Sequence, residues 1–243
     1  AKLEEATAAI KQIAKSGKKI LFVATKKQAK EIVANAAKSV GMPYITERWP
    51  GGMLTNFATQ RKSVKKMTGF DRFMKDESFN NISKKERLQV SRQKAKMEKL
   101  IGSIADLTRL TGALVIVDVL EEHIAVSEAQ KLGIPTIAIC DTNTDPTLID
   151  FPVPANDDAT KSISLIMNAM IKAIEEGLEE RKMDKEADRE REAAAEEEGG
   201  ERGDGEKEFE MSEEGEESGE AKSKYHAKKA ATHSRKPTTR KKD

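Results

Sequence analysis

The stretch 48–56, which reads RWPGGMLTN, combines residue types suited to contact with a phosphate-rich partner. It holds the chain's only tryptophan, Trp49, next to Arg48 and followed by the pair Gly51 and Gly52. Glycine allows a backbone to come close to another surface, and an arginine beside a flat aromatic ring offers a cation and a stacking face. A tight turn anchored by a buried Trp49 is an equally open interpretation.

A large excess of positive charge follows this stretch. Residues 48–99 contain 14 Lys and Arg against 5 Asp and Glu. A solvated coiled-coil face normally mixes both signs, whereas a one-sided excess suits phosphate contacts. A coiled-coil adaptor that binds only protein is a third hypothesis, and it predicts little salt dependence where RNA contact predicts a steep one. No aromatic-rich strand face is present for stacking bases, so we expect structured RNA recognised by shape and backbone. The predicted RNA-contact residues are Lys26, Lys27, Arg48, Thr55, Asn56, Arg61, Lys62, Lys65, Lys66, Lys84, Lys85, Arg87 and Arg92.

Polar residues at the predicted strand ends leave a nucleotide- or metal-binding enzyme as the alternative function. Its candidate residues are Thr25, Asp118, Asp141, Asn143 and Asp145, because ligands of doubly wound sheets bind at the carboxyl ends of strands.

Other features argue against an enzyme. The turn after the first strand, residues 24–28 (ATKKQ), has no glycine and matches neither a dinucleotide fingerprint nor a P-loop. His123 is interpreted as a capping or surface histidine, and the single cysteine, Cys140, as a buried apolar residue. We therefore expect no catalytic residue, no metal site, no cofactor and no small-molecule substrate.

The elements that position these residues alternate between helix and strand. Short apolar runs at 19–24, 113–117 and 134–139 are typical of strands buried in a parallel sheet, with weaker strand signals at 42–46 and 149–153. Helical patterns lie between them, with Thr25 and Asn156 as predicted N-caps and Gly133 as a helix end. This order predicts a doubly wound α/β sandwich.

A helical hairpin is predicted to interrupt the sandwich. Apolar residues near heptad spacing continue over 57–74 and 90–107, and Ser83 with Glu86 has the order of a capping box. We expect an antiparallel coiled coil at 54–101, inserted into a body made of 1–53 and 102–178. Trp49, Gly51 and Gly52 would form the structural junction between the two.

The charge of the chain is divided into opposed blocks. Residues 1–174 carry 27 Lys and Arg against 19 Asp and Glu, residues 175–220 carry 7 against 22, and residues 221–243 carry 9 against 1. The low apolar content after the last helix predicts a disordered tail at 179–243, acidic and then basic. No segment resembles a signal peptide or a membrane span, so a soluble cytoplasmic protein with no membrane partner is expected.

Six short segments follow one another along the chain: 19–26 (KILFVATK), 48–56 (RWPGGMLTN), 122–125 (EHIA), 133–135 (GIP), 141–146 (DTNTDP) and 154–159 (PANDDA). In this order they resemble the bacterial small-subunit ribosomal protein S-two family. The resemblance covers about residues 1–178 and implies a flavodoxin-like α/β body with a coiled-coil hairpin and no enzymatic activity. It also implies binding of small-subunit ribosomal RNA at the head–body junction and help in holding ribosomal protein S-one. Family members carry an N-terminal segment before the helix that begins here at Ala1, and their acidic endings are shorter than this tail.

Overall fold

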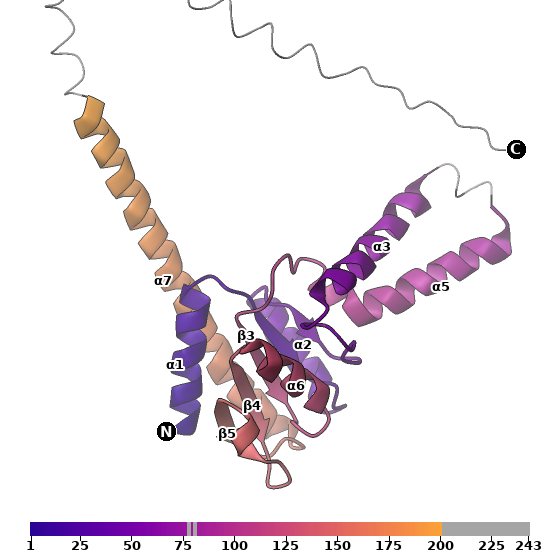
Figure 1. The fold of residues 1–243 in the computed structure, drawn as a ribbon, viewed down its shortest axis with the longest axis horizontal. Coiled ribbons are helices and arrows are strands. Elements are labelled where there is room, and N and C mark those ends of the chain that lie inside the picture. The colour runs from indigo at the N-terminus through magenta and orange to yellow at the C-terminus, as the bar shows by residue number, and fades with distance from the viewer. Residues whose placement is uncertain (77–78, 80–81, 201–243) are drawn as a thin grey trace, which may run out of the picture. The chain divides into compact units, whose positions relative to one another are not determined.

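Five short apolar segments form an all-parallel sheet with strand order β2-β1-β3-β4-β5. The computed structural model describes residues 1–76, 79 and 82–200 (Figure 1). The order reverses between β1 and β3, which confirms the predicted α/β sandwich on a parallel sheet. The strands are β1 (Ile20–Val23), β2 (Tyr44–Ile45), β3 (Ala113–Val117), β4 (Thr136–Cys140) and β5 (Phe151–Pro154).

Alternate side chains of the strands enter two separate hydrophobic clusters, one on each face of the sheet. On β1, Ile20 and Phe22 belong to one cluster and Leu21 and Val23 to the other, as the two-residue period of a strand requires. Helices cover both faces, which explains why β1 and β3 are apolar and buried along their whole length. The first face is covered by α1 (Lys2–Lys15), α2 (Lys30–Ser39) and α7 (Thr160–Gly200), and the second by α6 (His123–Leu132).

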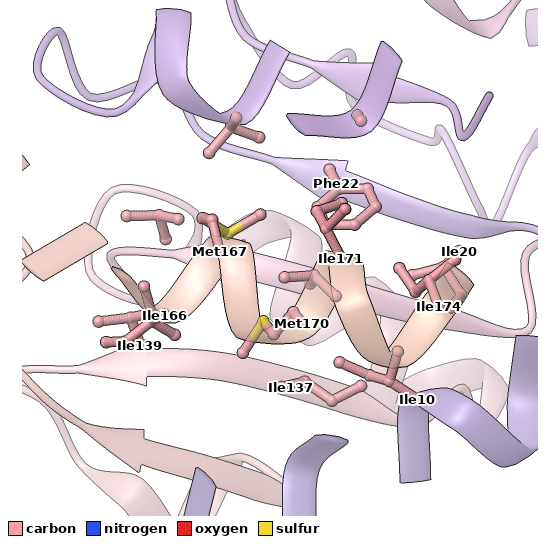
Figure 2. Close-up of a cluster of buried hydrophobic side chains, with 14 of the residues drawn as sticks. Ile10, Ile20, Phe22, Ile137, Ile139, Ile166, Met167, Met170, Ile171 and Ile174 are labelled. Atoms are coloured by element: carbon pink, nitrogen blue, oxygen red, sulfur yellow. The ribbon is translucent and has the colours of Figure 1, made fainter. Parts of the chain in front are cut away.

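The apolar stripe of α7 forms a large part of the first cluster. Figure 2 shows Met167, Met170 and Ile174 from this helix among side chains of the sheet and Ile10 of α1. At Gly177 the two helices come so close that an added Cβ would lie 2.6 Å from the carbonyl oxygen of Lys11. A glycine is therefore required at this crossing.

Two further helices, α3 (Phe57–Lys75) and α5 (Lys84–Ile101), lie between β2 and β3 in the chain and contact each other (Figure 1). Their ends nearest the sheet are part of the second cluster, through Val64, Met67 and Ile101. Ser83 begins α5 with the predicted capping box: its hydroxyl accepts from the backbone nitrogen of Glu86, and the Glu86 carboxylate accepts from the backbone nitrogen of Ser83. Short 3-10 turns follow at η1 (Gly102–Ile104) and η2 (Pro146–Leu148).

Two helix termini match the sequence and one does not. Gly133 ends α6 in the left-handed conformation, with φ of 62°, and Asn156 accepts from the backbone nitrogens of Asp158 and Ala159 before α7. The prediction that Thr25 caps α2 was wrong, because α2 begins only at Lys30 and has no side-chain cap. The backbone nitrogen of Thr25 donates instead to Glu122, which the sequence pattern did not reveal.

The structure also differs from the predicted tail. Helix α7 continues through residues 179–200, where disorder was expected. Ala, Glu, Lys and Arg are strong helix formers, and a helix already started by packing gains one hydrogen bond per added residue. The rest of the predicted tail, 201–243, lies outside the described residues. None of the helices described here is long and apolar enough to cross a membrane.

Candidate nucleic-acid interface

The loop 48–56 is folded around one buried carboxylate, that of Glu128 from α6, which is 6% exposed. The Trp49 indole donates to Glu128 Oε1 at 3.1 Å, and the backbone nitrogen of Gly52 donates to the same oxygen at 2.8 Å. The other oxygen accepts from the backbone nitrogens of Leu54 and Thr55, at 2.9 and 3.1 Å, and from the Thr55 hydroxyl at 3.2 Å. One side chain of the body therefore holds the whole loop.

The Glu128 carboxylate is stabilised in its ionised form. Burial alone would raise its pKa, but the hydrogen bonds from Thr55, Leu54, Trp49 and Gly52 outweigh burial and lower the pKa below the ordinary value. A charged acceptor binds backbone donors more strongly than a neutral one does. Glu128 thus acts as an anionic centre for the loop.

The loop forms a tight turn over a buried side chain. Trp49 is buried, and Met53 and Leu54 pack beside it in the second cluster. Gly52 has φ of 77°, a conformation that favours glycine, while Gly51 is exposed. The tight turn with a buried tryptophan is therefore the interpretation that the structure supports, and Arg48, Thr55 and Asn56 are exposed on the loop, as is Gly51.

Most of the predicted RNA-contact residues on α3 and α5 face solvent. They lie on the outer surfaces of the two helices, away from the apolar seam that joins them. Arg87 is half-buried, and Lys27 is exposed in the turn before α2. The exposed side chains of the helix pair are Lys62, Lys65, Lys66, Lys84, Lys85 and Arg92.

Arg61 holds the helix pair to the body. Its Nη1 donates to the carbonyl oxygens of Ala105 at 3.2 Å and Leu107 at 2.8 Å, in the segment after η1. A nearby ion pair has the same effect, because Glu47 lies 3.3 Å from Lys99 of α5. Arg61 is half-buried and serves first as a structural contact.

Lys26 lies within the fold, at the edge where β1 and β3 end. Its ammonium group is 2.8 Å from Asp157, 3.3 Å from Asp118 and 2.6 Å from Asp158. Burial lowers the pKa of Lys26, but the hydrogen bonds to the three aspartates outweigh it and raise the pKa above the ordinary value. Because its ammonium group pairs with aspartates of the same chain, Lys26 differs from the predicted RNA-contact lysines that are exposed.

The aspartates of the alternative enzyme hypothesis also form hydrogen bonds or ion pairs within the chain. Asp118, with φ of 67°, accepts from the backbone of Leu120 and pairs with Lys26. Asp141 accepts from the backbone of Thr142, and Asp145 accepts from the backbone and hydroxyl of Thr147. Among residues 1–76, 79 and 82–200, no three His, Cys, Asp or Glu side chains are grouped to hold a metal ion.

The remaining candidates for chemistry have ordinary surroundings. The Nδ1 of His123 lies 3.1 Å from the carbonyl oxygen of Leu120, and the side chain is exposed at the start of α6. Burial raises the pKa of the Cys140 thiol, which keeps the thiol protonated. Thr25 and Asn143 follow the ends of β1 and β4, at the same edge of the sheet. The backbone nitrogen of Thr25 donates to Glu122.

Comparison with known proteins points to one family. The family model described as ribosomal protein S2 matches residues 1–177. The chain is 64% identical over 185 residues to the small ribosomal subunit protein uS2 of Phocaeicola vulgatus, covering 76% of this chain and 66% of the relative. It is 61% identical over 184 residues to the protein of the same name from Cytophaga hutchinsonii, covering 76% of this chain and 72% of the relative.

Proposed function

The chain belongs to the ribosomal protein S2 family, and on that premise we propose that it is a structural constituent of the small ribosomal subunit, taking part in translation by binding ribosomal RNA. The chain matches about two thirds of the length of several of its relatives, 66% for that of Phocaeicola vulgatus. The proposal places RNA binding in the hairpin of α3 and α5 and in the loop 48–56. It includes the finer features expected of the family: a flavodoxin-like body, a coiled-coil form of the helix pair, a position at the head–body junction and help in holding ribosomal protein S-one.

One observation carries this proposal: exposed cations are concentrated on the two helices that lie outside the sandwich. Phosphate contacts by Lys and Arg supply most of the sequence-independent affinity for nucleic acid. Lys84 and Lys85 occupy the first turn of α5, where the helix dipole disfavours cations, so helix stability does not explain them. Phosphate binding does explain them.

The loop 48–56 connects this charged surface to the body. Asn56 is the N-cap residue of α3, so the backbone that Glu128 holds leads directly into the helix. Fixing Leu54 and Thr55 fixes the start of α3, and Arg61 fixes its second turn to the segment after η1. A preorganised surface loses less conformational entropy when it binds RNA.

The proposed role needs no cofactor, metal, membrane or small-molecule substrate. The family is one of ribosomal proteins and not of enzymes, and its members work in the ribosome, in the cytoplasm. The alternative enzyme has little support, because the carboxylates of Asp118, Asp157 and Asp158 already pair with the ammonium group of Lys26.

The direct test is a salt titration of binding between the full chain and purified small-subunit ribosomal RNA. The logarithm of the association constant should fall linearly with the logarithm of salt concentration, by about 0.7 to 0.9 for each phosphate neutralised. The Lys65→Glu, Lys66→Glu, Lys84→Glu and Lys85→Glu protein should bind more weakly and with a shallower slope. Affinity that is independent of salt, or equal in both proteins, would overturn the proposal and favour a protein-binding adaptor.

A further inference from the structure

One face of α5 carries a continuous stripe of cationic and amide side chains. The stripe borders a surface hollow of about 510 Å³. Its residues are spaced by three or four positions, which places them on one side of a helix. The stripe consists of Lys85, Leu88, Gln89, Arg92, Gln93 and Lys96.

This stripe is available to a partner. Val90 is half-buried and Ile101 packs in the second cluster, and both lie on a different side of the helix from the stripe. Leu88 is 52% exposed although it is apolar. Lys85, Arg92 and Lys96 make no ion pair with any of the described residues, and no position of the stripe is acidic. Its cations are therefore not neutralised by neighbours.

The order of the side chains along the stripe is informative. Lys85 and Lys96 stand at its two ends, separated by about 16 Å at a rise of about 1.5 Å per residue. Between them lies Arg92, flanked by Gln89 and Gln93, whose amides can both donate and accept hydrogen bonds. Cations therefore alternate with amides along the stripe, so one helix face can contact phosphates and the hydroxyl groups between them.

The groove that fits is the minor groove of an A-form RNA duplex. That groove is wide and shallow and displays 2′-hydroxyls, which both donate and accept hydrogen bonds, whereas the major groove of such a duplex is too deep and narrow for side chains. A glutamine amide matches a 2′-hydroxyl in both roles. DNA lacks this group, so the amides would add affinity only for RNA.

We propose that the α5 stripe binds an RNA duplex across its minor groove, with Lys85, Arg92 and Lys96 on the phosphates and Gln89 and Gln93 on the 2′-hydroxyls and base edges. This inference rests on the proposed binding of ribosomal RNA and specifies the helix face and the form of RNA. The apolar side chain of Leu88 contacts the sugar faces between the phosphate contacts.

The test compares the full chain on a short RNA duplex and on a DNA duplex of the same sequence. The wild-type protein should prefer RNA, and Gln89→Ala with Gln93→Ala should weaken RNA binding about tenfold while leaving DNA binding unchanged, as expected for the loss of about two hydrogen bonds. Gln12→Ala, an exposed glutamine of α1, is the matched control and should change neither affinity. Lys85→Ala, Arg92→Ala and Lys96→Ala together should weaken binding to both duplexes.

Several results would overturn the inference. Equal affinity of the wild-type protein for RNA and DNA would do so, as would an unchanged RNA preference in the glutamine variant. Full RNA affinity in the triple cation variant would show that the stripe does not bind RNA, and would leave a protein as the partner to test. If the Lys65, Lys66, Lys84 and Lys85 reversal still lost binding to ribosomal RNA in those cases, the proposed function would stand without this inference. Circular dichroism of each variant should match the wild type, since all of these positions face solvent.

Discussion

The indole nitrogen of Trp49 donates to the carboxylate of Glu128 across 3.1 Å, although 79 positions separate the two residues in the sequence. This bond joins the loop before the helix pair to α6 on the body. The only tryptophan of the chain therefore reports on the junction, because its fluorescence depends on whether this environment is intact.

Replacing Glu128 with alanine should destabilise the protein and loosen the loop. The change leaves the donors of Trp49, Gly52, Leu54 and Thr55 without their acceptor, those of Trp49 and Leu54 being buried, and the expected loss is about 2–4 kcal/mol in the free energy of unfolding. Urea unfolding measures the loss, and Trp49 emission should shift to longer wavelength. Glu179→Ala on the exposed side of α7 is the control and should stay within about 0.5 kcal/mol of the wild type.

The contribution of Glu128 should depend on pH in one direction. Its pKa in the folded protein lies below the ordinary value of 4.5, so the stabilisation is fully present above about pH 4.5 and is lost as pH falls through the folded-state pKa. The difference in unfolding free energy between wild type and Glu128→Ala should shrink below that pH. Glu122, whose pKa burial raises, is present in both proteins and so does not affect the comparison. A difference that grew on acidification would contradict the assigned ionised state.

Lys26→Met should unfold the protein more easily because it removes the cation from three carboxylates. Asp157 is 1% exposed and would remain buried without its partner, for which the expected cost is about 3–5 kcal/mol. Chemical denaturation measures the effect, with the neighbouring exposed Lys27→Met as control. A loss of RNA affinity in Lys26→Met without any loss of stability would show that Lys26 contacts RNA directly.

Two glycine-to-alanine changes in helices should have opposite signs. An alanine at Gly177 would place its Cβ 2.6 Å from the carbonyl oxygen of Lys11 and 3.0 Å from the Cβ of Ala14, so about 1–3 kcal/mol of stability should be lost. An alanine at Gly69 of α3 meets no atom within 4 Å and should stabilise the protein by about 0.5–1 kcal/mol. Thermal unfolding of the two variants would show both effects, and equal shifts would contradict the close crossing of α1 and α7.

Local patterns in the sequence predicted much of the fold. The strands at 113–117 and 134–139, the αL end at Gly133 and the capping box at Ser83 depend on neighbouring residues, and the structure contains them at or near the expected positions. The family was identified from six short segments and is confirmed by the match over residues 1–177.

Contacts between distant residues were not predictable in the same way. Glu128 looks like any acidic residue of a surface helix, and only its place between Ala125 and Ala129 on the buried side of α6 signalled an unusual role. Charge alone predicts that Lys26 contacts RNA, and the pattern does not reveal its partners Asp118 and Asp157, which are remote in the sequence. Low apolar content predicts disorder after residue 178, but good helix formers extend α7, which packing has already started.

The most direct measurement is co-sedimentation of the full chain with small ribosomal subunits after a high-salt wash. The wild-type protein should remain with the particles, and the Lys65→Glu, Lys66→Glu, Lys84→Glu and Lys85→Glu protein should be largely lost at the same salt concentration. Reversal of four exposed lysines elsewhere changes the net charge equally and should leave most of the protein bound; the positions are Lys18, Lys131, Lys161 and Lys172. Absence of the wild-type chain from washed particles, or equal retention of the two charge-reversed proteins, would contradict the account.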